Sequence, residues 1–439
     1  MIFGFFVLAY KLINYRIKFK FTSRGKWYCI FSEILYFLHI AFLYLIFDKQ
    51  IIILLISCVI NAVYPLIYKV LEFVLNLYFI RKNAKFIESQ SNKLKELNPI
   101  VIGITGSYGK TSCKKILEHF LKDDFNVIST DKNYNTPMGI AMTVNKLKPD
   151  NQILIAEMGA RKVGDIDELC RLFPPKYAII TGVCEQHTET FGSIEAIADE
   201  KYKLAKATIN QGGLCVFNTN NKFVFRMFKS HNGRKISASN SKKSNVYAGG
   251  IRLSDKGSTF DLHIGDSIYL CKTNLLGRHN IQNIVMCVAL AVELGCNIDK
   301  IVKKIENLPQ IKHRLEYMNS NGVHILDDGY NGNIKGVSSS FECLSYFPHK
   351  RVVVLQGIVE LGKESEEINA QIGEMAAKVA DTVILCGINV KYIEKGLNKA
   401  GFQGTIIRLK SFKQLNEVIK KEVRRGDTLL LQNDVPDVY

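Results

Sequence analysis

The sequence lacks several features that would assign it to a well-defined class of protein. Its 11 cysteines are scattered and form no Cys-x-x-Cys pair, which excludes the usual spacing of zinc sites and disulfide frameworks. No soluble stretch interleaves basic and aromatic residues, so no nucleic-acid partner is expected. Internal repeats and low-complexity tails are also missing. Most cysteines are therefore interpreted as small core residues of a reducing compartment.

The chain is long and positively charged, and it contains apolar runs. Its 439 residues are enough for two or three domains, each with its own core. A net charge of +17 and a pI of about 9.2 favour anionic partners, such as acidic headgroups or phosphorylated and carboxylated substrates. A membrane and a nucleotide are the partners that this composition favours.

The first 90 residues are predicted to form a membrane anchor. Residues 28–47 and 51–80 are apolar and long enough to cross a hydrocarbon core of about 30 Å as a helical hairpin. The run "MIFGFFVLAY" at 1–10 is either a third, short span or an interfacial helix. A cleaved signal peptide is the competing interpretation, but two long spans follow and no cleavage site is evident.

Charge predicts the orientation of this anchor. Basic residues cluster at 16–26 and 81–85, whereas the "DKQ" turn between the long runs is nearly neutral. By the positive-inside rule both clusters are cytoplasmic, and so is everything after residue 80. The predicted location is therefore the inner membrane, with the catalytic domains on its cytoplasmic side.

From about residue 99 the pattern is that of an α/β protein. Short β-branched runs such as "IVIGI", "ILIAEMG", "YAIITGV" and "RVVVLQG" alternate with amphipathic helical stretches, which predicts parallel sheets. The stretch 237–275 is richer in Ser and Gly and alternates, so a small antiparallel insert is expected there.

The stretch "GITGSYGKTS" at 103–112 has the features of a phosphate-binding loop. A strand, a Gly-rich turn and a helix start would surround a triphosphate with backbone N–H groups, with Lys110 reaching the outer phosphates and Thr111 ligating Mg²⁺. The full spacing would need glycine at 104, where the chain has Ile104; an accidental turn is the alternative. The predicted nucleotide contacts in the loop are Thr105, Gly106, Ser107, Gly109, Lys110, Thr111 and Ser112.

Three further candidates follow predicted strands or lie in the next helix. Glu157 ends a strand, where a carboxylate could complete a Mg²⁺ shell or simply be solvated. His187 lies in "GVCEQHTETFGS". A single histidine in a loop more often has no role in binding than acts as a metal ligand. Lys201 lies in a helix whose other lysines are expected at the surface, and local physics does not single it out.

Later candidates also have ordinary structural explanations. Asn280 and Asn283 lie about one turn apart at a helix start, which an N-cap with a polar neighbour would explain. Asp327 and Asp328 end a strand and could simply form a turn. Arg314 stands in "KHRLE".

Taken in order, these motifs resemble the signature series of the Mur ligase family. They are "TGSYGKTS", "AEMGA", "EQHTETFGS", "GRHNIQN", "HRLE" and "DDGYN", and the similarity covers roughly residues 99–439. Within the family, "DDGYNGN" and "VELG" are most similar to the D-alanyl-D-alanine-adding branch. The resemblance implies a P-loop-type central ATPase domain at 91–312 and a Rossmann-like C-terminal domain at 313–439.

The resemblance also implies a chemistry, ATP-dependent amide formation through an acyl phosphate. Lys110 matches the residue that stabilises the transferring phosphoryl group, and Thr111 and Glu157 match holders of one Mg²⁺. His187 matches a ligand of a second Mg²⁺, and Lys201 matches the lysine that CO₂ carbamylates near that metal. The nucleotide contacts that it implies are Asn280, Asn283, Arg314 and Asp328.

The chain departs from the family pattern where the amine and the UDP-sugar are expected. Gly357 and Asn369 stand where the D-alanyl-D-alanine-adding branch has Asp and commonly His, and Ile334 replaces Pro. Asn220 stands where Asp is frequent, and the ending "LLLQNDVPDVY" differs from a Lys-Gly-Ser-Arg type. The first 90 residues do not resemble a UDP-sugar-binding domain.

The leading hypothesis is a membrane-tethered ligase of the cell envelope that joins an anionic carboxylate to an amine. The carboxylate would be a nucleotide-sugar-linked peptidoglycan precursor, or a uronic acid of a capsule or lipid-linked polymer. Two alternatives remain open: a ligase for a soluble substrate, as in folate-type glutamylation, and a non-catalytic nucleotide-binding scaffold of the envelope machinery.

Overall fold

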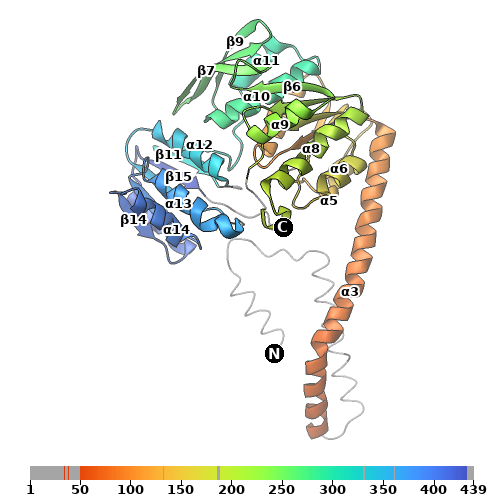
Figure 1. The fold of residues 1–439 in the computed structure, drawn as a ribbon. Helices are drawn as coiled ribbons and strands as arrows, with labels where there is room; N and C mark the ends of the chain where they lie inside the picture. Colours follow the sequence, from red (N-terminus) through yellow and green to blue (C-terminus); the bar gives the residue numbers. More distant parts are fainter. Residues whose placement is uncertain are drawn as a thin grey trace. The chain divides into compact units, whose positions relative to one another are not determined.

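The computed structural model describes residues 34, 38, 50–131, 133–184, 188–329, 332–359 and 361–432. Two compact units make up the chain, Met1–Glu88 and Ser89–Tyr439. The second unit contains two sheets covered by helices (Figure 1).

Helix α3, Gln50–Leu97, begins in the first unit, and its last residues belong to the second. Within the described residues, none of the helices combines the length and the apolar character that crossing a bilayer requires. Lys69 and Glu72 interrupt the apolar run of α3, and its last third is rich in charge from Arg81 onward. Apart from Ile34 and Leu38, the predicted segments 1–10 and 28–47 lie outside the described residues.

This finding contradicts the predicted membrane anchor at 1–90. The prediction rested on apolar length alone, whereas one continuous helix of 48 residues carries apolar and charged stretches in succession. The predictions of transmembrane helices, of the membrane as a partner and of an inner-membrane location are therefore corrected.

The larger sheet has nine strands in the order β2-β3-β1-β4-β5-β6-β7-β8-β9. The strands from β2 to β7 pair in parallel, and β7, β8 and β9 pair antiparallel. The antiparallel strands expected at 237–275 are thus present, but they extend the main sheet, which is mixed rather than parallel. The bounds are β1 Ile100–Thr105, β2 Val127–Ser129, β3 Ile153–Glu157, β4 Tyr177–Ile180, β5 Leu214–Asn218, β6 Arg234–Ser239, β7 Val246–Ser254, β8 Gly257–Ile264 and β9 Ser267–Thr273.

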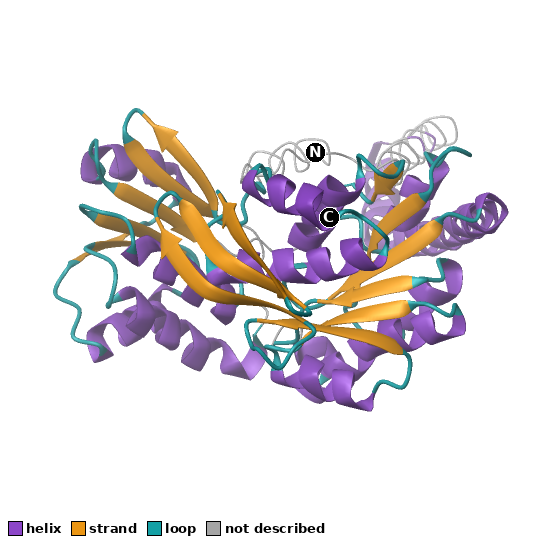
Figure 2. Cartoon of the chain, turned by 90° about the horizontal axis from the view of Figure 1, so that it is seen from above, coloured by secondary structure: helices purple, strands orange, loops and turns teal. Residues whose placement is uncertain are grey.

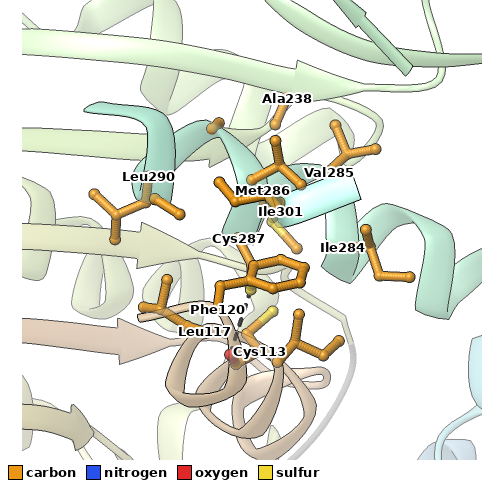
Figure 3. Packing of buried hydrophobic residues seen from close by; sticks show 14 of the residues in the cluster. Cys113, Leu117, Phe120, Ala238, Ile284, Val285, Met286, Cys287, Leu290 and Ile301 are labelled. Carbon is orange, nitrogen blue, oxygen red and sulfur yellow. Dashed lines mark hydrogen bonds between the residues drawn. The ribbon is translucent and has the colours of Figure 1, made fainter. Parts of the chain in front are cut away.

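Helices cover this sheet, and two of them form the centre of its core. Helix α10 is buried at every position from Asn280 to Ala291, because it packs both on α4 and on β5, β6 and β7. Figure 3 shows Leu117 and Phe120 of α4 facing Met286 and Cys287 of α10. The helices are α4 Lys110–Leu121, α5 Pro137–Asn145, α6 Asp165–Leu172, α7 Thr188–Phe191, α8 Ile194–Asn210, α9 Lys222–Ser230, α10 Arg278–Glu293 and α11 Ile298–Glu306.

The smaller sheet has six strands in the order β10-β11-β15-β12-β13-β14. Only its edge strand β10 is antiparallel, and two apolar clusters are built on its strands and helices. Figure 2 shows strands lying between helices. The strands are β10 Glu316–Ser320, β11 Val323–Asp328, β12 Arg351–Leu355, β13 Thr382–Leu385, β14 Thr405–Arg408 and β15 Thr428–Gln432. The helices are α12 Ile334–Ser345, α13 Ser365–Ala376, α14 Val390–Lys399 and α15 Leu415–Glu422, with short 3-10 turns at Gly362–Glu364 and Phe412–Gln414. The predicted domain bounds at 91–312 and 313–439 remain proposals.

Helices α13 and α14 approach so closely that only glycine fits at two positions. A Cβ on Gly396 would overlap the carbonyl oxygen of Ala370, and one on Gly373 would overlap that of Ile393. We expect Gly396→Ala to destabilise the protein by about 1–3 kcal/mol, because the helices must move apart. Urea unfolding of Gly396→Ala and of a control variant would measure this loss of stability. Gly336→Ala in α12 is the matched control, since its Cβ meets only the Asn333 side chain at 3.6 Å or more, and no loss is expected.

His231, which follows α9, is a buried histidine whose ring nitrogens have no hydrogen-bond partner among the described residues. Burial, together with the charge of Lys235, lowers the pKa of its imidazole. The unfolded chain therefore binds a proton more readily than the folded one, and stability should fall as pH drops below the ordinary pKa of about 6.5. We expect the free energy of unfolding to lose up to about 1.4 kcal/mol per pH unit from this residue. Denaturation from pH 7.5 to 5, compared with His231→Phe, would measure the difference in slope; equal slopes would contradict the prediction.

Candidate nucleotide-binding site

The predicted phosphate-binding loop joins β1 to α4. Gly106 and Gly109 have positive φ angles of 153° and 77°, and a Cβ on Gly106 would overlap the Thr181 hydroxyl. The Ser107 N–H donates to the carbonyl of Gly182 at 2.8 Å, which holds the loop against the chain that follows β4. Glycine is therefore required here both for the turn and for the close approach of two backbones.

The open end of the loop is suited to an anion. Gly109 precedes α4 and provides no side-chain cap, and the N-terminus of a helix favours an anion. Lys110 Nζ donates to the Gly106 carbonyl at 2.7 Å, which places its charge across the loop. Ser107 and Ser112 are buried, and Thr105 Oγ1 is buried without a partner among the described residues.

Glu157 meets the loop from the neighbouring strand β3. It pairs with Ile104 in the sheet register and is only 2% exposed. Thr111 Oγ1 donates to Glu157 Oε2 at 2.9 Å. Lys114 Nζ lies 3.3 Å from the same oxygen, and Asn135 Nδ2 lies 3.5 Å from the other one. The two residues expected to hold one metal ion are therefore in direct contact.

Lys201 lies on the buried face of α8 and is 4% exposed. Burial, reinforced by the nearby charge of Lys110, lowers the pKa of its ammonium to about 7. Of the lysines in this helix it is the one turned inward, a distinction that the sequence did not make. His187, its expected neighbour at the second metal, lies outside the described residues.

The two asparagines of α10 have different surroundings. Asn283 lies against the loop: its Oδ1 accepts a hydrogen bond from Cys113 Sγ at 3.4 Å and would be 2.9 Å from a Cβ on Gly109. Asn280 Nδ2 donates to the carbonyl of Leu276 at 2.9 Å, and its Oδ1 has no partner among the described residues. Asn283 thus joins the loop site, whereas Asn280 braces the segment before α10.

Arg314 lies just before β10, and Asp328 is the last residue of β11 in the smaller sheet. Asp328 Oδ1 accepts the N–H of Leu315 at 3.2 Å, and its Oδ2 accepts the hydroxyl of Ser340. The charges of both residues act on His279. Burial lowers the pKa of its imidazole, whereas the charge of Asp328 raises it.

Side-chain contacts join helices α10 and α12. The His279 ring bonds Ser339 Oγ of α12 at 2.7 Å, and Arg278 pairs with Glu342 at 2.9 Å. Lys335 of α12 lies over the ring of Tyr108 in the loop, with Nζ 5.9 Å from the ring centroid. Helix α12 therefore connects the smaller sheet to both α10 and the loop.

Sequence reasoning missed two residues of this site. Tyr108 packs over Gly182, and burial raises the pKa of its hydroxyl to about 12, opposed by a hydrogen bond from Asn221. Lys114 is fully buried beside Glu157. Its position three residues after Thr111, on the same helix face, is the signal that could have indicated it.

Two domains of one protein family match the chain. The Mur ligase middle domain matches residues 104–291, and the Mur ligase glutamate ligase domain matches residues 313–432. The chain belongs to the Mur ligase family. The loop, Glu157, Lys201 and Asn283 lie in the first match, and Arg314 and Asp328 lie in the second.

Named relatives agree with this membership. UDP-N-acetylmuramoyl-tripeptide–D-alanyl-D-alanine ligase of Escherichia coli is 30% identical over 292 residues, which cover 65% of this chain and 64% of that protein. The corresponding ligase of Bacillus subtilis is 24% identical, covering 77% and 74%. The match to the Escherichia coli Mur ligase thus spans less than two thirds of that relative's length.

Solved structures show the same fold. MurF of Acinetobacter baumannii superposes with a TM-score of 0.72 at 24% identity, covering 80% of this chain and 77% of that one. MurF of Thermotoga maritima in complex with ADP gives 0.71 at 24% identity, covering 80% of each chain. At this level of identity the likeness establishes the Mur ligase fold.

Proposed function

We propose that this Mur ligase forms an amide bond at the expense of ATP. The carboxylate oxygen of one substrate attacks the γ-phosphorus, ADP leaves, and the amine of the second substrate then displaces phosphate from the acyl phosphate. The observation that carries the proposal is the contact of Thr111 with Glu157 beside a loop spanned by Lys110. Family membership supports the same reaction.

The residues of the loop account for the phosphoryl transfer step. Lys110 and the N-terminal N–H groups of α4 would hold the phosphates and stabilise charge that develops on the transferring group. Thr111 Oγ1 and Glu157 Oε2, 2.9 Å apart, offer the oxygen ligands that Mg²⁺ prefers. Bound there, Mg²⁺ would neutralise phosphate charge. Asn283 supports the loop from α10.

Lys201 is proposed to be carbamylated. A neutral lysine nitrogen adds to the carbon of CO₂ and releases a proton, so an amine with a pKa of about 7 is well prepared for this reaction. The change from cation to anion would remove its repulsion with Lys110 and supply oxygens for a second Mg²⁺, with His187 as the other expected ligand. Arg314, Asp328 and Asn280 are proposed to contact the nucleotide when the smaller sheet's domain closes on it.

The proposed substrates are a nucleotide-sugar-linked peptide carboxylate and D-alanyl-D-alanine, the substrates in the relatives' name. The region after β12 departs from the family pattern at Gly357 and Asn369, however. A Cβ on Gly357 would overlap Asn369 Oδ1, and Asn369 binds both the N–H and the carbonyl of Ile358, at 2.8 and 3.0 Å. An aspartate therefore does not fit at Gly357 without displacing Asn369.

The test is phosphate release by the full chain with Mg·ATP, UDP-MurNAc-tripeptide and D-alanyl-D-alanine, with mass spectrometry of the product. We expect phosphate release that requires both substrates and a new amide that joins them. ATP turnover without this amide would contradict the proposed substrate pair. The absence of both nucleotide binding and ATP turnover would contradict the ligase proposal itself. The scaffold and the capsule-type substrates have no observation in their favour.

A further inference from the structure

Lys114 of α4 is a fully buried lysine that the proposed reaction does not use. Its side chain is 0% exposed, and its Nζ lies 3.3 Å from Glu157 Oε2 and 3.4 Å from Thr130 Oγ1. An ammonium group is costly to bury unless it has an ionic partner. Any of several apolar side chains would fill this position without that cost, so the charge of Lys114 calls for an explanation at Glu157.

Lys114 and Thr111 meet the same oxygen atom. They lie three residues apart on one face of α4, and Glu157 Oε2 is 2.9 Å from the Thr111 hydroxyl and 3.3 Å from the Lys114 ammonium. The other oxygen, Oε1, has a weak contact with Asn135 at 3.5 Å. The oxygen that faces Thr111, where a metal ion is expected, is therefore already neutralised by a cation of the protein.

This arrangement opposes metal binding before the nucleotide arrives. A divalent cation shared by Thr111 and Glu157 would be close to the ammonium of Lys114, in a buried region where charge repulsion is strong. Lys110 adds a further positive charge at the loop. The negative charge needed to overcome this repulsion is carried by the phosphates of a nucleotide.

We propose that Lys114 is an internal counter-ion of Glu157 that makes divalent-cation binding at Thr111 and Glu157 depend on bound nucleotide. The inference rests on the proposed function, since it assumes the nucleotide site at the loop. It assigns Lys114 a positioning role through Glu157, and it implies that metal and nucleotide enter together rather than metal first.

The test measures the affinity of the full chain for Mn²⁺, a paramagnetic probe for the Mg²⁺ site, with and without ADP. Electron paramagnetic resonance detects the bound and free Mn²⁺. For the unaltered protein we expect weak binding of Mn²⁺ alone and tight binding with ADP. Lys114→Met should bind Mn²⁺ without ADP at least about tenfold more tightly, because a close positive charge is gone. The gain from adding ADP should shrink by the same factor.

Two further variants assign the effect. Lys115→Met is the matched control, because Lys115 is the next residue, is 44% exposed and pairs with Glu118 at 2.8 Å, and its Mn²⁺ binding should be unchanged. Lys114→Met combined with Glu157→Gln should lose the gain, which locates the metal at Glu157. If Lys114→Met does not fold, Lys114→Gln makes the same comparison while keeping a donor toward Glu157 and Thr130.

The outcomes separate the two proposals. If ADP strengthens Mn²⁺ binding in the unaltered protein but Lys114→Met binds Mn²⁺ alone no more tightly, the counter-ion role is overturned and the proposed function stands. If ADP does not strengthen Mn²⁺ binding in the unaltered protein, the proposed nucleotide site fails and the inference fails with it.

Discussion

Replacing Lys110 by alanine is expected to lower amine-dependent phosphate release at least about a thousandfold. Lys110 Nζ lies 2.7 Å from the Gly106 carbonyl, so its charge is held across the loop rather than turned to solvent. Phosphoryl transfer needs positive charge where negative charge develops, and a distant lysine cannot supply it. Initial rates of phosphate release at saturating substrates would measure the loss.

A matched control makes this result specific. Lys115→Ala removes a lysine from the same helix, but one that is 44% exposed and paired with Glu118, and its rate should stay within about twofold of the unaltered protein. Thermal unfolding of both variants would show that the fold is intact. Full activity in Lys110→Ala would be incompatible with the proposed ligase.

Lys201→Ala is expected to lower the rate at least about a hundredfold, through loss of the carbamate that would complete a second metal site. The distinguishing observation is rescue: acetate or formate added to Lys201→Ala should restore part of the rate by supplying a carboxylate in the space left. Lys203→Ala is the control, since Lys203 lies in the same helix and pairs with Asp167 and Glu200.

The pKa of Lys201 also predicts how carbamylation depends on pH. Because the pKa is about 7, the reactive neutral amine should be a minor form at pH 6 and the major form at pH 8. In CO₂-depleted buffer the activity of the unaltered protein should fall and return when bicarbonate is added, with a faster return at pH 8. An activity that is indifferent to CO₂ would show that Lys201 acts as an amine, and unrescued inactivity would indicate a structural role.

Much of the fold could be predicted because its signals are local. The strands β1, β3, β4 and β12 were recognisable as short β-branched runs between helical stretches, since burial on both faces demands continuous apolar residues. Edge strands such as β2 and β10 were missed because they are short or polar. The loop at 103–112 was also a local prediction, since strand, turn and helix are contiguous.

The predicted anchor failed for a related reason. An apolar run indicates that its side chains are buried from water, but it does not indicate whether lipid or protein buries them. Along α3 the charged and apolar stretches belong to one continuous helix, and no described helix meets the requirements of a bilayer span.

The sequence by itself determined the family and the loop, because these depend on neighbouring residues and ordered motifs. Only the tertiary structure decided which side chains meet. Thr111 and Glu157 are 46 residues apart and touch because β3 lies beside β1 in the sheet. The inward orientation of Lys201 and the partner of Lys114 have the same origin, since burial and charge pairing are set by packing between elements that the chain order does not place together.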